Sequence, residues 1–361
     1  MQNNINLLDF CQQSMKDWLI EIGQPGFRAQ QLINWLHQQF VDNFDEMLNL
    51  PKPFRTWLKE NARIHQLPIM HEHISQDGTI KWLLGVDAAN AVEMVYIPES
   101  TRGTLCISSQ VGCALDCSFC STGKQGFNRN LTSGEIIGQL RLANTRLKDL
   151  YPSRLKPITN VVMMGMGEPL ANEKHVTEAL RLMIDDHAYG LAYRRVTVST
   201  SGMVPAMLRL KENLPNIAMA VSLHAPNDTL RNELVPINQK YPLSKLMAVC
   251  AKYYEGQKKR QITYEYVMLK GVNDSLEHAK ELSQLLRQAP GKINLIPFNP
   301  FKNSPYKTSD RAQILAFQQY LRDDYVTTIR TTRGDDISAA CGQLVGDVAD
   351  KTRRIKIHQE P

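Results

Sequence analysis

The sequence predicts an α/β protein: an open, partial (β/α)6 barrel preceded by an N-terminal helical accessory domain and a β extension. Three observations support this fold. Apolar residues change from helical spacing to a period of two near His71, and strand and helix patterns alternate from Gly103 onward. Hydrophobic residues make up 43% of the chain and charged residues 22%, which permits a sizeable core. At roughly 150 residues per domain, the 361 residues correspond to two or three domains or to one barrel with appendages.

Residues 1–70 are predicted to form the helical domain. Apolar side chains recur at helical spacing in Leu32, Ile33 and Leu36, and prolines mark a turn before the next apolar stretch. Residues 71–102 are predicted to form a β-hairpin extension, because Ile80–Leu84 and Val92–Tyr96 are two runs with apolar residues at alternate positions.

Residues 103–325 carry six strand–helix units, and parallel strands need crossovers of this kind. Thr132 with Glu135, and Asp274 with Glu277, are predicted to cap two of the helices. A closed barrel needs eight units, so six suit an open one, with its ligand site at the carboxyl ends of the strands. The predicted strands are 104–108, 158–164, 195–199, 217–223, 262–268 and 293–297, and the predicted helices are 133–150, 173–185, 204–213, 243–254, 276–288 and 311–323.

Composition and charge exclude several classes of protein. No apolar run approaches the roughly 20 residues of a membrane span, and the polar N-terminus does not resemble a signal peptide, so we expect a cytoplasmic protein without a membrane partner. The chain has 42 Lys and Arg against 36 Asp and Glu, and the net charge of +6 permits nucleic-acid binding without requiring it. The odd number of seven cysteines argues against a disulfide framework.

Three cysteines, Cys113, Cys117 and Cys120, follow the first predicted barrel strand at the spacing CxxxCxxC. Thiolates are soft ligands that suit iron–sulfur clusters and zinc. A structural zinc site needs four protein ligands, and this segment holds a single CxxC pair. Three ligands on a 4Fe–4S cluster would instead leave one iron open for chemistry. The alternatives are a zinc knuckle completed by His224 and a redox pair of Cys117 with Cys120.

This cluster, with the aromatic Phe119 before its last cysteine, resembles the motif of the radical S-adenosylmethionine (SAM) superfamily. The resemblance implies that Cys113, Cys117 and Cys120 hold a 4Fe–4S cluster whose open iron binds SAM. The segment Gly165–Pro169 resembles the superfamily's Gly-Gly-Glu-type motif, whose Glu holds the SAM ammonium group. The implied SAM contacts are Gly167, Glu168, Ser199, Ser222, Leu223, His224 and Asn299.

Two further cysteines favour one subgroup. Cys106 precedes the cluster, and Cys341 lies in a Gly- and Ala-rich loop of the C-terminal segment 326–361, where a lone thiol would otherwise be read as inert. The chain resembles the radical SAM RNA adenine methyl synthases over nearly its full length. The segment Arg333–Asp336 and the helical N-terminal domain favour the enzymes that methylate carbon 2 of adenine over the sister enzymes that methylate carbon 8.

The resemblance implies a SAM-dependent RNA (adenine-C2) methyltransferase that uses two SAM molecules per turnover. Cys341 takes a methyl group from the first SAM. The second SAM yields a 5′-deoxyadenosyl radical that activates this methyl group, and its addition to adenine links protein and RNA. Cys106 then forms a disulfide bond with Cys341 and releases the RNA. The resemblance implies that Glu93 is the general base that removes the ring proton of adenine, with Cys106 as the alternative. Glu93 lies between apolar strand positions, an environment that favours a raised pKa.

The resemblance also implies the partners. The substrates would be 23S rRNA, in the peptidyl-transferase region, and a subset of tRNAs, at an adenosine next to the anticodon. A donor such as flavodoxin would supply electrons to a monomer, and residues 1–70 would read RNA shape. Arg194–Arg195, Lys258–Arg260 and the basic tail from Lys351 are candidates for phosphate contacts, with solvated charged faces as the alternative. The non-enzymatic alternative is a metal-binding RNA-binding protein.

Overall fold

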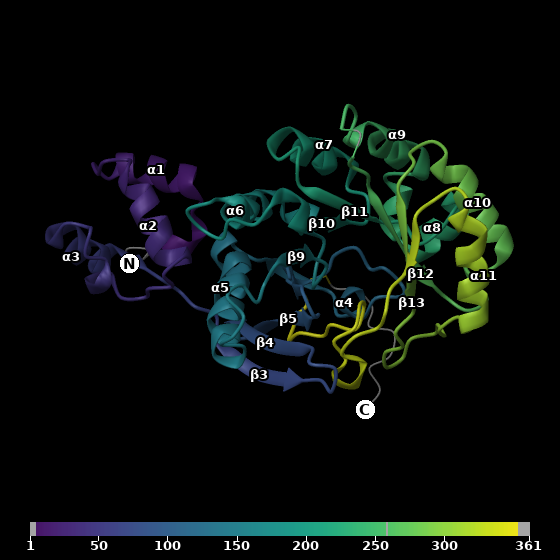
Figure 1. Ribbon diagram of the computed structural model, residues 1–361, viewed down its shortest axis with the longest axis horizontal. Helices are drawn as coiled ribbons and strands as arrows, with labels where there is room; N and C mark the ends of the chain where they lie inside the picture. The colour runs from purple at the N-terminus through teal and green to yellow at the C-terminus, as the bar shows by residue number, and fades with distance from the viewer. Residues whose placement is uncertain (1–4, 258, 353–361) are drawn as a thin grey trace.

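One ten-stranded sheet organises the chain (Figure 1). The computed structural model describes residues 5–257 and 259–352, so the basic positions Lys258, Arg353, Arg354 and Lys356 lie outside the described residues. The strands of this sheet are β3 (Ile69–Ile74), β4 (Ile80–Asp87), β5 (Asn90–Pro98), β6 (Gly103–Cys106), β9 (Asn160–Met163), β10 (Val196–Thr200), β11 (Ala218–Ser222), β12 (Thr263–Met268), β13 (Lys292–Pro297) and β14 (Thr327–Ile329).

The sheet has a parallel part and an antiparallel part. Its order is β14-β13-β12-β11-β10-β9-β6-β5-β4-β3, and neighbours run parallel from β14 to β6 and antiparallel from β6 to β3. The six predicted barrel strands are confirmed to within two residues at each end, and β14 adds a further parallel strand. Val161, Val196 and Val198 are fully buried, as expected for parallel strands covered on both faces.

Helices cover the outside of the parallel strands (Figure 1). The six predicted helices are present as α5 (Ser133–Leu150), α6 (Glu173–Ile184), α7 (Val204–Asn213), α9 (Leu243–Tyr253), α10 (Leu276–Leu286) and α11 (Arg311–Arg322), and the unpredicted ones are α4 (Ser121–Lys124) and α8 (Asp228–Leu234). The capping box of Thr132 and Glu135 is confirmed. The prediction for Asp274 is wrong: Ser275 caps α10, because the Asp274 carboxylate accepts a hydrogen bond from the Gly271 N–H in the preceding turn.

The N-terminal domain is helical, as predicted, and is fixed to the barrel through α5 and α6. It contains β1 (Ile5–Asn6), α1 (Gln12–Glu21), α2 (Arg28–His37), α3 (Lys52–Asn61) and β2 (Ala62–Arg63). Asp9 accepts a 2.7 Å hydrogen bond from the Gly134 N–H at the start of α5, and Glu178 of α6 accepts one from Ser14. The buried Arg141 of α5 donates to the Leu36 carbonyl.

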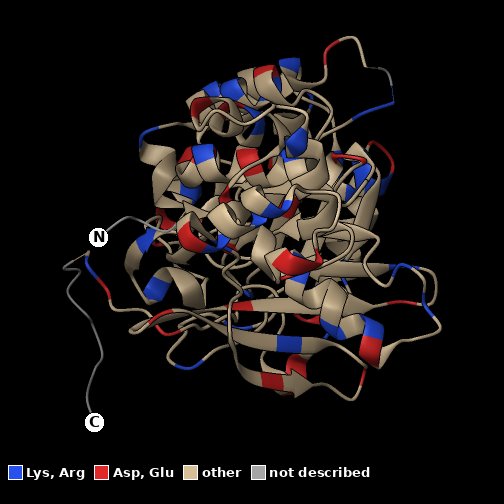
Figure 2. Ribbon diagram, turned by 90° about the vertical axis from the view of Figure 1, so that its left-hand side faces the viewer, with Lys and Arg blue, Asp and Glu red and all other residues tan. Residues whose placement is uncertain are grey.

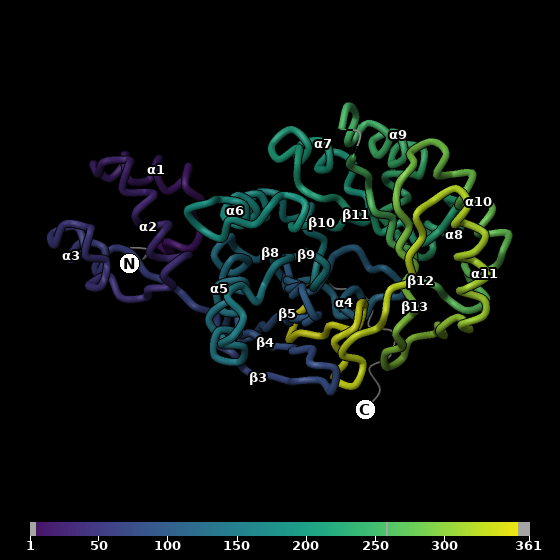
Figure 3. The backbone as a smooth tube through the Cα atoms, viewed as in Figure 1, coloured from purple at the N-terminus to yellow at the C-terminus, as the bar shows by residue number. Residues whose placement is uncertain are grey.

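The β extension is part of the barrel sheet, because β5 pairs directly with β6. A small hairpin of β7 (Gln110–Gly112) and β8 (Phe127–Asn130) encloses the cysteine segment. The chain after β14 returns to lie beside β5 and α4 (Figure 3), where the Ala91 N–H donates to the Asp347 carbonyl and the Ser121 N–H to that of Gly342. Within the described residues, the helices lack the length and apolar composition that crossing a bilayer requires.

Candidate active site

A cavity of about 160 Å³ lies at the carboxyl ends of β9 to β13, where the sequence predicts the ligand site. Cys120 and Cys341 both line it. Leu223, in contrast, is fully buried outside its lining, and its N–H donates to the Glu265 carbonyl. The residues that were expected to contact SAM and that line the cavity are Gly167, Glu168, Ser199, Ser222, His224 and Asn299.

The cysteine loop, residues 113–126, is held by local hydrogen bonds. The Cys113 N–H donates to the Gly126 carbonyl at 2.7 Å, and the Cys120 N–H donates to the Cys117 carbonyl. Gly112 has φ +75°, and a Cβ there would overlap the Gly126 carbonyl oxygen, so only glycine fits at this entrance to the loop. The three thiols are half-buried.

The chemistry of this donor set fits an iron–sulfur cluster. Burial and the neighbouring Cys113 and Cys120 raise the pKa of Cys117 well above its usual value, and burial also raises that of Cys120. Cations would therefore be needed to hold these sulfurs as thiolates. Within residues 5–257 and 259–352, no three His, Cys, Asp or Glu side chains surround a position for a single ion. A cluster binds each cysteine through a different iron, so its ligands need not meet at one point.

Glu168 lies in the cavity wall with part of its carboxylate already in use. Oε1 accepts a hydrogen bond from the Leu170 N–H and Oε2 accepts one from the Ser201 N–H at 2.8 Å. Burial raises the pKa of this carboxyl, and the backbone hydrogen bonds oppose the shift. The side-chain hydroxyls of Thr200 and Ser201 also hydrogen-bond to this carboxyl and oppose the effect of burial on its pKa. Gly167 has φ +98° and lies where a Cβ would overlap the Gln110 side chain.

Ser199, Ser222 and His224 supply further polar groups at neighbouring strand ends. The hydroxyl oxygens of Ser199 and Ser222 are 3.4 Å apart. His224 Nδ1 accepts a hydrogen bond from the Val267 N–H, and burial lowers the pKa of this imidazole to about 3. The ring is therefore neutral with its proton on Nε2, which makes Nε2 a donor.

Cys341 lies in the wall between this cavity and a second one of about 40 Å³, which Cys106 also lines. Asn299 Nδ2 donates to the Cys341 carbonyl at 3.1 Å, so Asn299 holds the backbone of this residue as well as lining both cavities. Burial and the nearby Cys341 raise the pKa of Cys106 to about 12. The expected disulfide bond between them is not present in this structure: both thiols are free, Cys106 at the end of β6 and Cys341 on the chain after β14.

Glu93 is buried on β5, directly under the loop that carries Cys341. Its Oε1 is 2.9 Å from Lys81 Nζ, and its Oε2 accepts a 2.8 Å hydrogen bond from the Val345 N–H. Burial raises the pKa of Glu93, whereas Lys81 and the Val345 N–H lower it. Lys81 also donates to the Ser338 carbonyl. Glu93 lines neither cavity, so the structure joins it to the Cys341 loop rather than to the cavity surface.

Comparisons with known proteins agree with this geometry. Residues 107–283 match the model of the radical SAM superfamily, and residues 5–64 match that of the ribosomal RNA large subunit methyltransferase N-terminal domain. A radical SAM methyltransferase from Sphaerobacter thermophilus is 41% identical, with a TM-score of 0.86, and the match covers 94% of this chain and 99% of the other. The chain belongs to the radical SAM methyltransferases.

Two more distant structures share parts of the fold. The protein SuiB of Streptococcus suis, bound to S-adenosylmethionine, is 14% identical with a TM-score of 0.39, and the match covers 63% of this chain and 47% of that one. A mutant spore photoproduct lyase is 12% identical with a TM-score of 0.43, over 62% of this chain and 75% of that one. These low scores add nothing about function.

Membership of the radical SAM methyltransferases decides between the alternatives that the sequence left open. The chain is an enzyme of the RlmN type, whose family acts on ribosomal RNA, so the non-enzymatic alternative is wrong. The superfamily also implies a 4Fe–4S cluster and SAM. A zinc knuckle through His224 finds no support in the geometry, since Nδ1 of that ring is bonded to the backbone.

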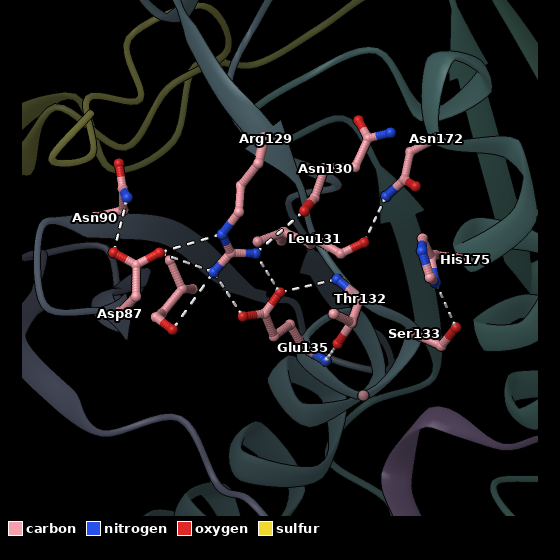
Figure 4. A network of polar contacts seen from close by, with 12 residues as sticks. Asp87, Asn90, Arg129, Asn130, Leu131, Thr132, Ser133, Glu135, Asn172 and His175 are labelled. Atoms are coloured by element: carbon pink, nitrogen blue, oxygen red, sulfur yellow. Dashed lines mark hydrogen bonds and ion pairs between the residues drawn. The ribbon is translucent and has the colours of Figure 1, made fainter. Parts of the chain in front are cut away.

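A polar network outside the cavities joins the β extension of this radical SAM methyltransferase to the segment after the cysteine loop (Figure 4). Arg129 of β8 lies between Asp87 at the end of β4, at 3.0 Å, and Glu135 of α5, at 2.8 Å. Glu135 also accepts a hydrogen bond from the Thr132 N–H. The start of α5 and the β7–β8 hairpin are therefore fixed together.

Sequence reasoning missed two basic residues of the site. Arg330 follows β14 and lines both cavities, and nearby Cys341, followed by Glu265 and Cys106, raises its pKa despite burial. Lys81 is the ion-pair partner of Glu93. Arg330 could have been found, because it follows a short strand, as the other polar residues of the cavity do. No sequence signal linked Lys81 to Glu93.

Proposed function

We propose that this radical SAM methyltransferase adds a methyl group to carbon 2 of adenine in the peptidyl-transferase region of 23S rRNA, and in a subset of tRNAs at the adenosine next to the anticodon. The observation that carries the proposal is Cys341 in the wall between two cavities. One cavity offers polar groups suited to SAM, and the other contains a second thiol, Cys106. A methyl carrier between donor and acceptor needs this arrangement.

Cys113, Cys117 and Cys120 would hold the cluster, and Glu168 with the serine pair would hold the SAM amino-acid group. When bound, these cofactors supply an organic radical that removes a hydrogen atom from a methyl group. Electrons for this chemistry would come from a cytoplasmic donor such as flavodoxin. The chain's own task is then to place the methyl group where that hydrogen can be removed.

Cys341 is the proposed methyl carrier. Carbon 2 of adenine is electron-poor and does not attack a sulfonium methyl, whereas a thiolate does. The Cys341 sulfur takes the methyl group from one SAM, loses its proton and releases S-adenosylhomocysteine, and a second SAM serves the radical step. The guanidinium of Arg330 lies close to Cys341 and lines both cavities.

Glu93 is the proposed base for the ring proton. Lys81 and the Val345 N–H favour its ionised form, although burial opposes this. The alternative base, Cys106, has its pKa raised to about 12 and is a neutral thiol in this state. This contrast supports Glu93 over Cys106 as the proton acceptor.

Cys106 is the proposed releasing group. Once methylene has joined Cys341 to adenine, the Cys106 thiol gives up its proton and its sulfur attacks the Cys341 sulfur. A sulfur–sulfur bond forms, the sulfur–carbon bond breaks, and the carbon leaves with the electron pair and takes a proton to become the methyl group. An external thiol must then reduce the two sulfurs, which returns the free state seen in this structure.

The test is anaerobic reconstitution of the protein with iron, sulfide, reductant and SAM, followed by incubation with 23S rRNA or tRNA and nucleoside analysis. We expect 2-methyladenosine, and the Cys341→Ala protein should give none. If 8-methyladenosine formed instead, the carbon 8 alternative would hold. If SAM were cleaved but neither RNA were modified, the proposed substrates would be wrong.

A further inference from the structure

A cavity of about 660 Å³ lies away from the active site. It is bounded by the end of α2 in the N-terminal domain, the end of α5, and the segments that precede β9 and β10. We call this cavity the interdomain groove. It lies at the amino ends of β9 and β10, whereas the active-site cavity lies at the carboxyl ends of those strands.

The interdomain groove is strongly basic. Lys148, Lys156, Arg194 and Arg195 line it and are all exposed, and Asp186 is the acidic residue in its lining. Across residues 5–257 and 259–352, none of these four cations forms an ion pair with a carboxylate. Four cations around one hollow outnumber its single carboxylate, and a polyanion would be attracted to that excess of positive charge.

The surrounding surface is not uniformly basic. Lys and Arg are interspersed with Asp and Glu over the face that includes the N-terminal domain (Figure 2). On this side of the molecule Arg146 pairs with Glu72 at 2.9 Å, and Arg181 lies 3.4 Å from Glu178. The interdomain groove differs from this surface in gathering four cations and one carboxylate, Asp186, around a single hollow.

Aromatic and imidazole groups form the inner part of the groove. Lys148 Nζ lies 4.5 Å from the centroid of the Phe40 ring, and the Tyr189 ring packs against the rings of both Phe40 and His37. His37 Nδ1 is 3.2 Å from the Tyr189 hydroxyl, whereas Nε2, in a residue that is 1% exposed, has no hydrogen-bond partner. A buried polar atom without a partner is costly, and an acceptor from a ligand would satisfy it.

We propose that the interdomain groove binds the sugar–phosphate backbone of the substrate RNA at nucleotides outside the target adenosine. The inference rests on the proposed function in taking RNA as the polyanion. Four exposed cations along a groove match several phosphates in a row better than a single small anion. Since α2 and α5 both line the groove, bound RNA would contact the N-terminal domain and the barrel together.

Backbone contacts in the interdomain groove carry no base identity, because phosphates are the same at every position. The groove would therefore supply affinity and orientation, and the active site would select the adenosine. It lies at the opposite ends of the strands from the active site, so a substrate must extend well beyond the target nucleotide to reach both. A short oligonucleotide around the target should bind without using the groove.

The first test compares two doubly charge-reversed proteins. The groove variant is Arg194→Glu with Arg195→Glu, and the matched control is Arg311→Glu with Arg322→Glu, two exposed arginines on α11 at the far end of the sheet. Both variants change the net charge equally. The dissociation constant for full-length tRNA or a 23S rRNA fragment is measured across a series of salt concentrations, without turnover.

We expect the groove variant to bind long RNA about tenfold more weakly, with the slope of log affinity against log salt reduced by about 1.5, roughly 0.7–0.9 for each lost phosphate contact. The control should stay within about twofold of the parent. With a short stem-loop, the parent and the groove variant should bind alike. Equal affinities and slopes for parent and groove variant on long RNA would overturn the proposal.

Methyl transfer from SAM to Cys341, measured without RNA, verifies that each variant is folded and that its active site is intact. Failure of the proposed function is distinguishable from failure of this inference, because binding is measured independently of methylation. A protein that bound long RNA through the groove but left adenine unmodified would refute the proposed reaction alone. A Lys148→Met protein, which alters a different side of the groove, should weaken long-RNA binding by about threefold.

Discussion

Two segments carry the reactive sulfurs of this enzyme, and the structure holds them in different ways. The cysteine loop is enclosed by the β7–β8 hairpin, with bonds between residues close in sequence, such as Cys113 to Gly126. The Cys341 loop is held by groups far away in the chain, including Thr122, Asn299 and the Glu93–Lys81 pair. The two loops also contact each other, since the Ser121 N–H and the Thr122 hydroxyl donate to the Gly342 and Leu344 carbonyls. The cysteine loop thus has local bonds in addition to these contacts, whereas the Cys341 loop depends on bonds to distant groups.

Cys341→Ala is the sharpest test of this contrast. It removes the proposed methyl carrier without touching the cysteine loop, so methylation of RNA should fall by about 10³-fold or more. Iron and sulfide content, and SAM cleavage by the reduced protein, should stay at the parent level. Loss of the cluster in this variant would show that the two segments depend on each other for their geometry.

Cys106→Ala should stop turnover at a later point. Methyl transfer to Cys341 and addition to RNA do not need Cys106, so protein cross-linked to RNA should accumulate in about one equivalent. Denaturing gel electrophoresis after incubation with labelled RNA measures the adduct. The double variant, Cys106→Ala with Cys341→Ala, is the control and should give no adduct. Normal release of methylated RNA by the single variant would contradict the role of Cys106.

Gly112→Ala tests the local contacts that hold the cysteine loop. Its added Cβ would overlap the Gly126 carbonyl at φ +75°, so we expect a loss of about 2–4 kcal/mol in stability and a marked fall in bound iron. Gly23→Ala is the matched control, because φ is +72° but the space is open. It should cost about 1 kcal/mol and leave iron content unchanged. Thermal unfolding and iron analysis measure both.

Lys81→Met tests the long-range contacts of the Cys341 loop, and we expect it to reduce methylation the least of these substitutions. Lys81 lowers the pKa of Glu93, so its loss should raise that pKa further and keep the base protonated to higher pH. The acid limb of the pH–rate profile for RNA methylation should therefore move to higher pH, with a several-fold loss near neutrality. His73 on β3 also lowers this pKa and remains in the variant.

Lys81→Arg keeps the charge and should restore the parent profile. Methyl transfer to Cys341 does not use Glu93 as a base, so a change in its rate in the Lys81→Met protein would report the lost contact with the Ser338 carbonyl. An unchanged acid limb in the Lys81→Met protein would show that Glu93 is not the group whose ionisation limits the rate.

Sequence patterns predicted the fold well because they report local chemistry. The six strand–helix units and the capping box of Thr132 depend on residues a few positions apart, which is the range over which periodicity and capping act. The cap at Asp274 was wrong, because two neighbouring residues both had suitable side chains and the turn after β12 uses Asp274. Helix α8 has only seven residues and too short a pattern to be recognised.

The candidate site was predicted where residues follow strands and missed where it depends on distant pairs. The resemblance implied Ser199, Ser222 and Asn299, and they line one cavity because the strand ends near which they lie meet at one edge of a parallel sheet. Lys81 became relevant only through its ion pair with Glu93, a diagonal neighbour across β4 and β5, and through the Ser338 carbonyl. Such pairings are set by tertiary assembly, and no spacing within one segment reveals them.

The continuous pairing from β4 through β5 to β6 makes the β extension and the first barrel strand one hydrogen-bonded ladder. A change in stability should therefore alter the amide hydrogen-exchange rates of β5 and β6 in the same direction, because the two strands belong to one cooperative unit. An engineer who grafted this extension onto another barrel would have to transplant β6 with it, and with β6 comes the thiol at its end.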